Sequence, residues 1–271
     1  MIWSKMKIIK LMREKTLQVF SVLIIIYLML PLAVIILLSF NKPKGRQNTS
    51  WNEFSLDAWT NICRDQTICS SFATSIKIGL LVTIISTIIG TMISFALIRH
   101  RYRGRGATSL LVFLPLATPE VILGASLLAL FLNIFIPLGF WTILLAQITF
   151  TISFVVVVVN ARLAGMDPRL EQAAMDLYAT PLQTFRYVTF PIALPGIMAA
   201  ALLSFSLSFD DFIVTTFNSG RVVTFPIYIW GAAQRGIPPQ VNVIASLMFL
   251  GSLLLVLLAS LISKKRKVTQ S

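Results

Sequence analysis

The chain alternates between long apolar stretches and short polar or basic ones. A membrane-spanning helix needs about 20 predominantly apolar residues. Six stretches approach or exceed that length: 17–40, 72–98, 107–135, 140–160, 188–217 and 240–263. This pattern predicts an all-α membrane protein with six transmembrane helices, organised as a single transmembrane domain over residues 1–271.

Prolines mark where these helices are expected to be irregular. Membrane helices tolerate proline because neighbouring groups satisfy the backbone atoms that it frees. We expect a kink at Pro31 in the first helix, interruptions at Pro115 and Pro119 in the third, and a break at Pro191 and Pro195 near the start of the fifth.

The N-terminal apolar stretch is interpreted as a retained helix. Residues 1–15 are basic and precede it, as in a signal peptide, but a signal peptide has only 7–15 apolar residues before a small-residue cleavage site. The stretch 17–40 is longer and has no convincing cleavage site.

Composition supports the membrane interpretation and excludes several functions. Hydrophobic residues make up 56% of the chain, charged residues only 12%, and the mean hydropathy is +0.84. The net charge of +13 lies in short runs between apolar stretches and not along one face, which argues against nucleic-acid binding. One histidine and two cysteines form no metal-ligand pattern, and no phosphate-binding loop or catalytic motif is present. We therefore expect no catalytic residue, metal or cofactor in this chain.

The distribution of basic residues predicts the orientation. Sixteen of the 23 Lys and Arg residues lie in the N-terminal segment, in 99–106, around the polar segment 167–187, or in 264–267. Short loops rich in Lys and Arg stay in the cytoplasm. Both termini are accordingly expected inside, and the protein is expected to be multi-pass.

Residues 41–70 then lie outside the cytoplasm. They contain the two cysteines, Cys63 and Cys69, separated by five residues. In an oxidising compartment these can form a disulfide, and otherwise they are two unpaired thiols. The sequence leaves both possibilities open.

A polar segment, residues 167–187, separates the fourth and fifth apolar stretches. Asp167 can accept backbone N–H groups at a helix start, and Pro168 suits the first helical turn. Thr180 and Pro181 repeat this arrangement after an interruption at Tyr178–Ala179. The pattern predicts two short cytoplasmic helices, forming either a docking element or an amphipathic loop on the membrane surface.

This polar segment resembles the EAA loop of the permeases of ABC importers. The family pattern is Glu-Ala-Ala, three residues, Gly, nine residues, then Ile-x-Leu-Pro. The chain has Gln172-Ala173-Ala174 with Tyr178 at the Gly position, then Val188-Thr189-Phe190-Pro191 at the same spacing. Pro119-Glu120, residues 148–167 and residues 203–217 are similar to the polyamine (spermidine/putrescine) subgroup, and specifically to its second permease subunit.

The resemblance implies the architecture and the partners. The fold would be that of a type I ABC-importer permease in the bacterial plasma (inner) membrane. A homodimeric ATP-binding subunit would dock on 167–187 and bind ATP and Mg itself, and a homologous second permease and an extracytoplasmic substrate-binding protein would complete the importer. The ATPase-coupling residues implied are Glu171, Gln172, Ala173, Ala174, Asp176, Leu177 and Tyr178.

Two positions depart from the family pattern. Gln172 stands where the family has Glu, and Glu171 precedes it, so the charge is expected from a shifted position. Tyr178 replaces a Gly that would allow a turn or a close approach. We expect Tyr178→Gly to leave assembly with the ATPase intact.

Three carboxylates within apolar stretches are candidates for the substrate path. A charged side chain in a membrane is costly and usually faces a cavity. We expect Asp210 or Asp211, together with Glu120, to form a constriction that prefers cations. Adjacent residues point about 100° apart on a helix, so only one aspartate is expected to line the path. The alternative is structural: the aspartates cap a broken helix or bond to a partner permease.

Two aromatic residues outside the membrane have two interpretations. Tyr228 and Trp230 can contact an alkylammonium group through cation–π attraction, or they can anchor the chain at the membrane interface. The interfacial role is the commoner one for such residues.

Other functions remain open to test. The same machinery carries ferric ion, other amines or amino-acid derivatives in similar proteins. A stand-alone secondary carrier or channel is disfavoured by the polar segment and by the absence of an evident repeat. A purely structural scaffold is disfavoured by the unpaired intramembrane carboxylates.

Overall fold

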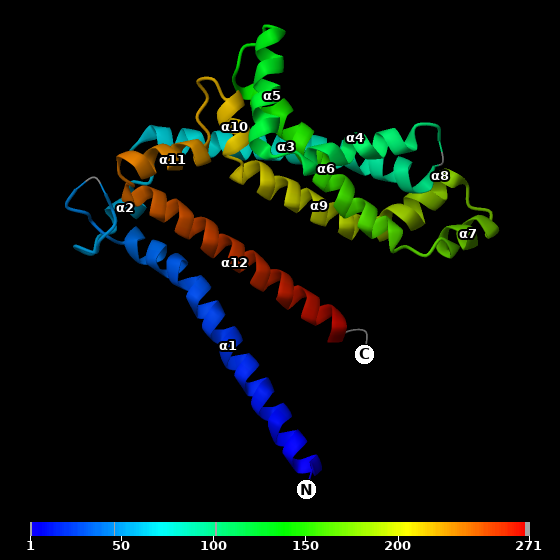
Figure 1. Ribbon diagram of the computed structural model, residues 1–271, viewed down its shortest axis with the longest axis horizontal. Coiled ribbons are helices and arrows are strands. Elements are labelled where there is room, and N and C mark those ends of the chain that lie inside the picture. Colours follow the sequence, from blue (N-terminus) through cyan, green and yellow to red (C-terminus); the bar gives the residue numbers. More distant parts are fainter. Residues whose placement is uncertain (1, 46, 101, 269–271) are drawn as a thin grey trace. The chain divides into compact units, whose positions relative to one another are not determined.

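The computed structural model describes residues 2–45, 47–100 and 102–268, with side chains described for 15–254 of these. The described chain is helical, with one isolated antiparallel bridge between Asn41 and Phe54. Its contacts divide it into two compact units, Met1–Gln66 with Ile229–Ser271, and Thr67–Tyr228. Figure 1 shows the helices of both units.

The first unit is built on α1 (Ile2–Ser39) and α12 (Pro239–Val268), which contact each other. The helix α1 continues through Pro31. After α1 the chain is fixed by two buried asparagines: the Asn41 amide donates to Asn48 Oδ1 at 2.6 Å, and the Asn48 amide donates to the carbonyl of Leu38 at 2.7 Å.

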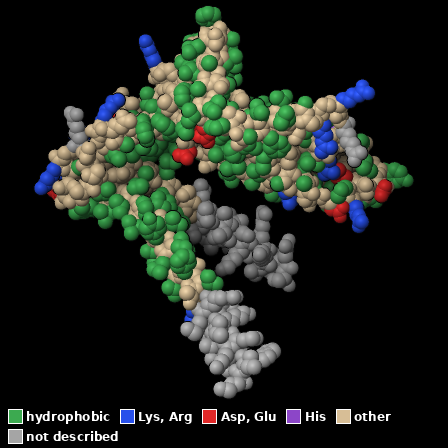
Figure 2. Space-filling model, in the orientation of Figure 1, with side chains coloured by type: hydrophobic (Ala, Val, Ile, Leu, Met, Phe, Trp, Pro, Cys, Tyr) green, Lys and Arg blue, Asp and Glu red, His purple; other side chains and the backbone are tan. Residues whose placement is uncertain are grey.

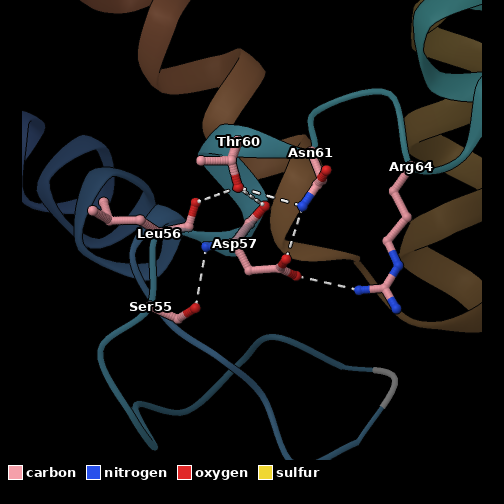
Figure 3. Close-up of polar contacts among 6 residues, drawn as sticks. All are labelled: Ser55, Leu56, Asp57, Thr60, Asn61 and Arg64. Atoms are coloured by element: carbon pink, nitrogen blue, oxygen red, sulfur yellow. Dashed lines mark hydrogen bonds and ion pairs between the residues drawn. The ribbon is translucent and has the colours of Figure 1, made fainter.

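A short helix, α2 (Asp57–Thr60), follows in the same connecting segment. Figure 3 shows Asp57 accepting from Asn61 and pairing with Arg64. The Arg64 Nη1 to Asp57 Oδ2 distance is 3.2 Å. Both side chains of the ion pair are more than half exposed, so it adds little stability. Cys63 and Cys69 are both disulfide-bonded, which answers the question that the sequence left open.

The core of the second unit is formed by α3 (Gln66–Arg99), α6 (Phe140–Ala164) and α9 (Phe190–Asp210). Small residues let α3 and α6 approach closely, as is usual between membrane helices. A Cβ at Gly90 would lie 2.6 Å from Val155 Cγ1. One turn later Ser94 Oγ donates to the carbonyl of Val156 at 3.3 Å.

The third apolar stretch is two helices and not one. The helices α4 (Arg105–Ala117) and α5 (Glu120–Asn133) meet at an angle of 110°. Pro115 lies inside α4, so the expected interruption there is wrong. Pro119 stands at the break, where the missing N–H and the restricted preceding residue end the helix.

The fifth apolar stretch also differs from the prediction. The chain enters it through α8 (Pro181–Thr184) and a π-helical turn, η1 (Phe185–Thr189). The prediction of a break at Pro191 and Pro195 is wrong, because α9 runs through both prolines. The break comes after Asp210, before α10 (Ile213–Asn218).

The segment between the fifth and sixth apolar stretches contains a helix, α11 (Phe225–Arg235). Among the described residues, four helical segments are long and apolar enough to cross a membrane: Lys15–Ser39, Gln66–Arg99, Phe140–Ala164 and Pro181–Asp210. The bent pair of α4 and α5 makes a fifth if it is one span, and Pro239–Leu254 is a shorter apolar helix.

Candidate functional site

The polar segment between α6 and α9 folds as two short helices, as predicted. The carboxylate of Asp167 accepts the backbone N–H of Arg169 at 2.9 Å and precedes α7 (Arg169–Asp176). At the start of α8, the N–H of Thr180 donates to Gln183 Oε1 at 2.8 Å and the Gln183 N–H returns to Thr180 Oγ1. This reciprocal capping box fixes the start of α8.

The turn between the two helices is a Schellman motif. The N–H of Tyr178 donates to the carbonyl of Met175 at 2.9 Å, and the N–H of Ala179 donates to that of Ala174 at 3.1 Å. This motif requires a left-handed residue, usually Gly, just after the helix. Tyr178 occupies that place with φ +61°. The left-handed backbone at this position therefore explains why the family pattern has Gly where this chain has Tyr178.

The outer surface of this segment is apolar to an unusual degree for a polar loop. The exposed fractions are 82% for Leu177, 96% for Tyr178, 75% for Leu182 and 70% for Tyr187. Gln172, Ala173 and Asp176 are also exposed, whereas Ala174 and Glu171 are partly buried. Figure 2 shows charged side chains of both signs around the end of the unit where α7 and α8 lie.

Glu171 points into the protein, unlike Gln172 beside it in the sequence. Its Oε1 lies 2.7 Å from Nη2 of Arg99, the last residue of α3, and accepts the hydroxyl of Thr189 at 2.6 Å. The Glu171 and Arg99 side chains are only 20% and 22% exposed.

A second polar cluster lies where α9 ends. The carboxylate of Asp211 accepts the N–H groups of Val214 and Thr215, at 3.3 and 2.8 Å, and the Thr215 hydroxyl. The amide of Gln147, from α6, donates to Asp211 Oδ2 at 3.3 Å and to Thr215 Oγ1 at 2.8 Å. Asp211 thus caps α10 and ties it to α6, the structural role that the sequence left as an alternative.

Asp210 differs from its neighbour. It is the last residue of α9, its side chain is exposed, and no side-chain hydrogen bond or ion pair is found for it within the described residues. Glu120 begins α5 after Pro119 and is also exposed. In Figure 2, acidic side chains are visible where α5, α9 and α10 lie.

The helix α5, which begins at Glu120, packs closely against α10, the helix that follows Asp210 and Asp211. A Cβ at Gly124 would lie 2.9 Å from the ring of Phe217 and 3.3 Å from Cα of Val214. Asn218 also donates to the carbonyl of Gly124 at 3.3 Å. Glu120 lies four residues before Gly124, about one turn of α5 from this contact. Asp210 lies on the other side of the break between α9 and α10.

The remaining candidates, Tyr228 and Trp230, lie on α11. The side chain of Trp230 is 57% exposed and that of Tyr228 is partly buried. Both have interactions in the structure. Their role in binding stays a prediction.

Sequence reasoning missed the partners that hold the acidic residues. They are Arg99 and Thr189 for Glu171, and Gln147 and Thr215 for Asp211. The separations of 61 to 68 residues between Gln147 and its partners leave no local signal. A glutamine in an apolar helix was the one hint, because a polar side chain there needs a partner.

Comparison with known proteins gives consistent matches over most of the chain. The permease protein PotC of the spermidine/putrescine transport system of Haemophilus influenzae is 36% identical over 247 residues, 91% of this chain and 95% of that protein. PotC of Escherichia coli is 33% identical over 248 residues, 91% and 93% of the two chains. The putrescine transport system permease PotI of Escherichia coli is 34% identical over 231 residues, 82% and 81%.

Solved structures give the same fold at lower sequence identity. A bacterial ABC transporter that imports the acidic polysaccharide alginate matches with a TM-score of 0.62 at 16% identity, covering 91% of this chain and 94% of that one. An amino acid ABC transporter matches with a TM-score of 0.59 at 18% identity, covering 78% of this chain and all of the other.

The family model described as "binding-protein-dependent transport system inner membrane component" matches residues 86–268. That range covers α4 to α12, including the two-helix polar segment and the acidic end of α9. The chain belongs to this family of inner-membrane transport components.

Proposed function

We propose that this chain is a membrane-spanning permease subunit of an ATP-driven importer for polyamines such as spermidine and putrescine. The observation that carries the proposal is the likeness to the polyamine permeases PotC and PotI over more than four fifths of the chain. ATP hydrolysis would take place on a separate subunit. A second, homologous permease and an extracytoplasmic binding protein would complete the importer.

The two-helix segment 167–187 is proposed as the docking element for the ATP-hydrolysing subunit. Three large apolar or aromatic side chains of this segment are mostly exposed and contribute little to its own packing: Leu177, Tyr178 and Leu182. Exposed apolar groups rimmed by charged ones are typical of protein–protein contacts. Gln172 and Ala173 lie on the exposed side of α7, so we assign them to the same surface.

The proposed topology has six spans with both termini in the cytoplasm. The four apolar helical segments, the bent pair and the shorter helix Pro239–Leu254 together account for the six. The basic residues and the disulfide-bonded cysteines support one orientation. Disulfides persist in oxidising compartments, so Cys63 and Cys69 belong outside the cytoplasm.

This topology can be tested with single introduced cysteines, because the native pair is bonded. Gln47→Cys in the first unit and Arg103→Cys after α3 are suitable sites. In intact cells, a membrane-impermeant maleimide should label only Gln47→Cys, and after the membrane is opened it should label both. The reverse labelling would invert the orientation.

For the substrate path we propose Asp210 and Glu120, with Asp211 as a structural neighbour. A polyamine carries several ammonium groups, and an exposed carboxylate in an apolar setting attracts them strongly. Asp211 already accepts hydrogen bonds from Val214, Thr215 and Gln147, which leaves it little capacity for a substrate.

The testing experiment is ATPase activity in proteoliposomes. The chain is reconstituted with its candidate ATPase, second permease and binding protein, with and without spermidine. We expect spermidine with binding protein to stimulate hydrolysis. We expect Ala173→Trp to abolish the stimulation because bulk at the docking surface prevents a close fit, and Ala174→Trp to abolish it because Ala174 is partly buried and a larger side chain there would displace α7. Ala107→Trp, an exposed alanine of α4 outside the loop, is the matched control.

The outcomes separate the parts of the proposal. Stimulation by another cargo but by no polyamine would keep the importer and reject the substrate. Failure of the wild-type chain to associate with any ATPase would reject the importer itself. Spermidine transport by this chain alone, without ATP, would favour a secondary carrier.

A further inference from the structure

The polar segment is joined to the membrane helices at its inner side by one carboxylate. Glu171 lies in the first turn of α7, Arg99 is the last residue of α3, and Thr189 ends the π-helical turn that leads into α9. Both Arg99 Nη2 and Thr189 Oγ1 reach the same oxygen, Oε1, at 2.7 and 2.6 Å. Three elements, one of them 72 residues away along the chain, therefore meet at one atom.

The Glu171–Arg99–Thr189 junction is less exposed to water than a surface ion pair. Thr189 is 4% exposed, and Glu171 and Arg99 are 20% and 22% exposed. The other ion pair within the described residues, Arg64–Asp57, has side chains that are 71% and 53% exposed. Water screens the exposed pair strongly, whereas the partly buried pair retains more of its attraction.

Further contacts join the same helices near this junction. The rings of Phe95 in α3 and Phe185 in η1 pack edge to face with centroids 5.3 Å apart. On the adjacent helix, the guanidinium of Arg162 makes two hydrogen bonds to the carbonyl of Ile192, at 2.9 and 2.7 Å. The start of α9 is thus attached to α3 and α6, and Glu171 attaches α7 to this assembly.

The π-helical turn places Thr189 in reach. A π turn inserts one extra residue into a helix and changes the direction of the following side chains. Phe190 N–H bonds to the carbonyl of Phe185, five residues back, which is the widened hydrogen bond of such a turn. Thr189 ends this turn, and its hydroxyl donates to Glu171.

We propose that Glu171 is a positioning residue that transmits movement of α7 to α3 and α9 together. The inference rests on the proposed docking of the ATPase on 167–187. A force that displaces α7 reaches α3 through Arg99 and α9 through Thr189, so the two helices move as one body. Without this link, α7 is joined to the membrane helices only through its chain connections and its contacts with α8 and η1, and hydrolysis on the partner is transmitted less completely.

The test uses the fully reconstituted importer and measures spermidine taken up per ATP hydrolysed. Glu171→Gln and Arg99→Gln should each lower this ratio about tenfold, within the usual range of coupling between sites. Retention of the ATPase during purification should be unchanged. Arg103→Gln is the matched control: it removes an exposed arginine in the same basic run and should leave the ratio unaltered.

Two further comparisons distinguish positioning from a general structural role. The exchange Arg99→Glu with Glu171→Arg should restore part of the ratio that each single reversal removes. Thr189→Ser keeps the hydroxyl and should keep the ratio, whereas Thr189→Val removes the hydroxyl at constant size and should lower the ratio.

Each result bears on a different claim. A wild-type ratio in both single variants, or losses that simply add in the double variant, would overturn the inference. Loss of the ATPase from the Glu171 variant alone would also overturn it, because Glu171 would then be a docking residue. If the wild-type chain retains no ATPase, the proposed function itself fails.

Discussion

Two polar breaks in this apolar chain are built alike, one at the polar segment 167–187 and one where α9 meets α10. In each, one acidic side chain is held by an ion pair or hydrogen bonds from other elements, and a neighbouring residue stays exposed. Glu171 is held by Arg99 and Thr189 while Gln172 is exposed. Asp211 is held by Gln147 and Thr215 while Asp210 is exposed.

At both breaks, one polar residue has a structural role and its neighbour in the sequence is left to bind a partner or a substrate. The held carboxylate sets the geometry, because its hydrogen bonds fix the direction of a short helix. The side chain of the exposed neighbour makes no hydrogen bond or ion pair that is found within the described residues, so it can bind a partner or a substrate.

The largest effect is expected for Asp211→Ala. The substitution removes the acceptor of the Val214 and Thr215 N–H groups at the start of α10 and leaves the Thr215 hydroxyl without its acceptor, which should cost about 2–3 kcal/mol in the free energy of unfolding. Thermal unfolding of the purified chain in detergent measures this. Asp210→Ala should change stability by about 0.5 kcal/mol or less. Equal losses would contradict the comparison at α9.

The next effect concerns the exposed side of the polar segment. Leu182→Asp places a charge on the proposed docking surface, where Leu182 is 75% exposed, and should weaken ATPase binding at least about tenfold, as changes at energetically important interface residues do. Pull-down with a titrated ATPase subunit measures the affinity. Tyr102→Asp, at an exposed position in the basic run after α3, is the control. Unchanged affinity would exclude Leu182 from the interface.

Asp210→Asn should reduce spermidine uptake about tenfold, since loss of one charge attraction of about 1.4 kcal/mol has that effect. Folding and ATPase association should be unchanged. Uptake into proteoliposomes is the measurement, and Glu53→Gln removes an exposed carboxylate elsewhere as a control. Uptake at the wild-type rate would remove Asp210 from the path.

The smallest effect is expected for Tyr178→Gly. Gly adopts the left-handed backbone of the Schellman turn without strain, which stabilises the folded state. Because Gly also loses more conformational entropy on folding, the net rise in the free energy of unfolding should be only about 1 kcal/mol or less. ATPase association should persist. A large drop in the unfolding temperature would mean that the Tyr178 ring, although 96% exposed, makes a needed contact.

Local signals in the sequence predicted the helical architecture and the polar segment well. The apolar stretches placed the long helices α1, α3, α6 and α9, because burial in lipid requires continuous runs of apolar residues. Asp167 and Thr180 act at the helix starts as predicted, because capping involves residues only two or three positions apart. The family spacing of 167–191 is also a local pattern.

Only the tertiary structure decided which polar residues are held and where the helices break. Proline prefers certain backbone angles but does not force a break, so α9 runs through Pro195 whereas the chain turns by 110° at Pro119. From the sequence alone, Asp210 and Asp211 could not be distinguished. Their difference comes from Gln147, more than 60 residues away, because a buried hydrogen bond depends on proximity in space and not along the chain.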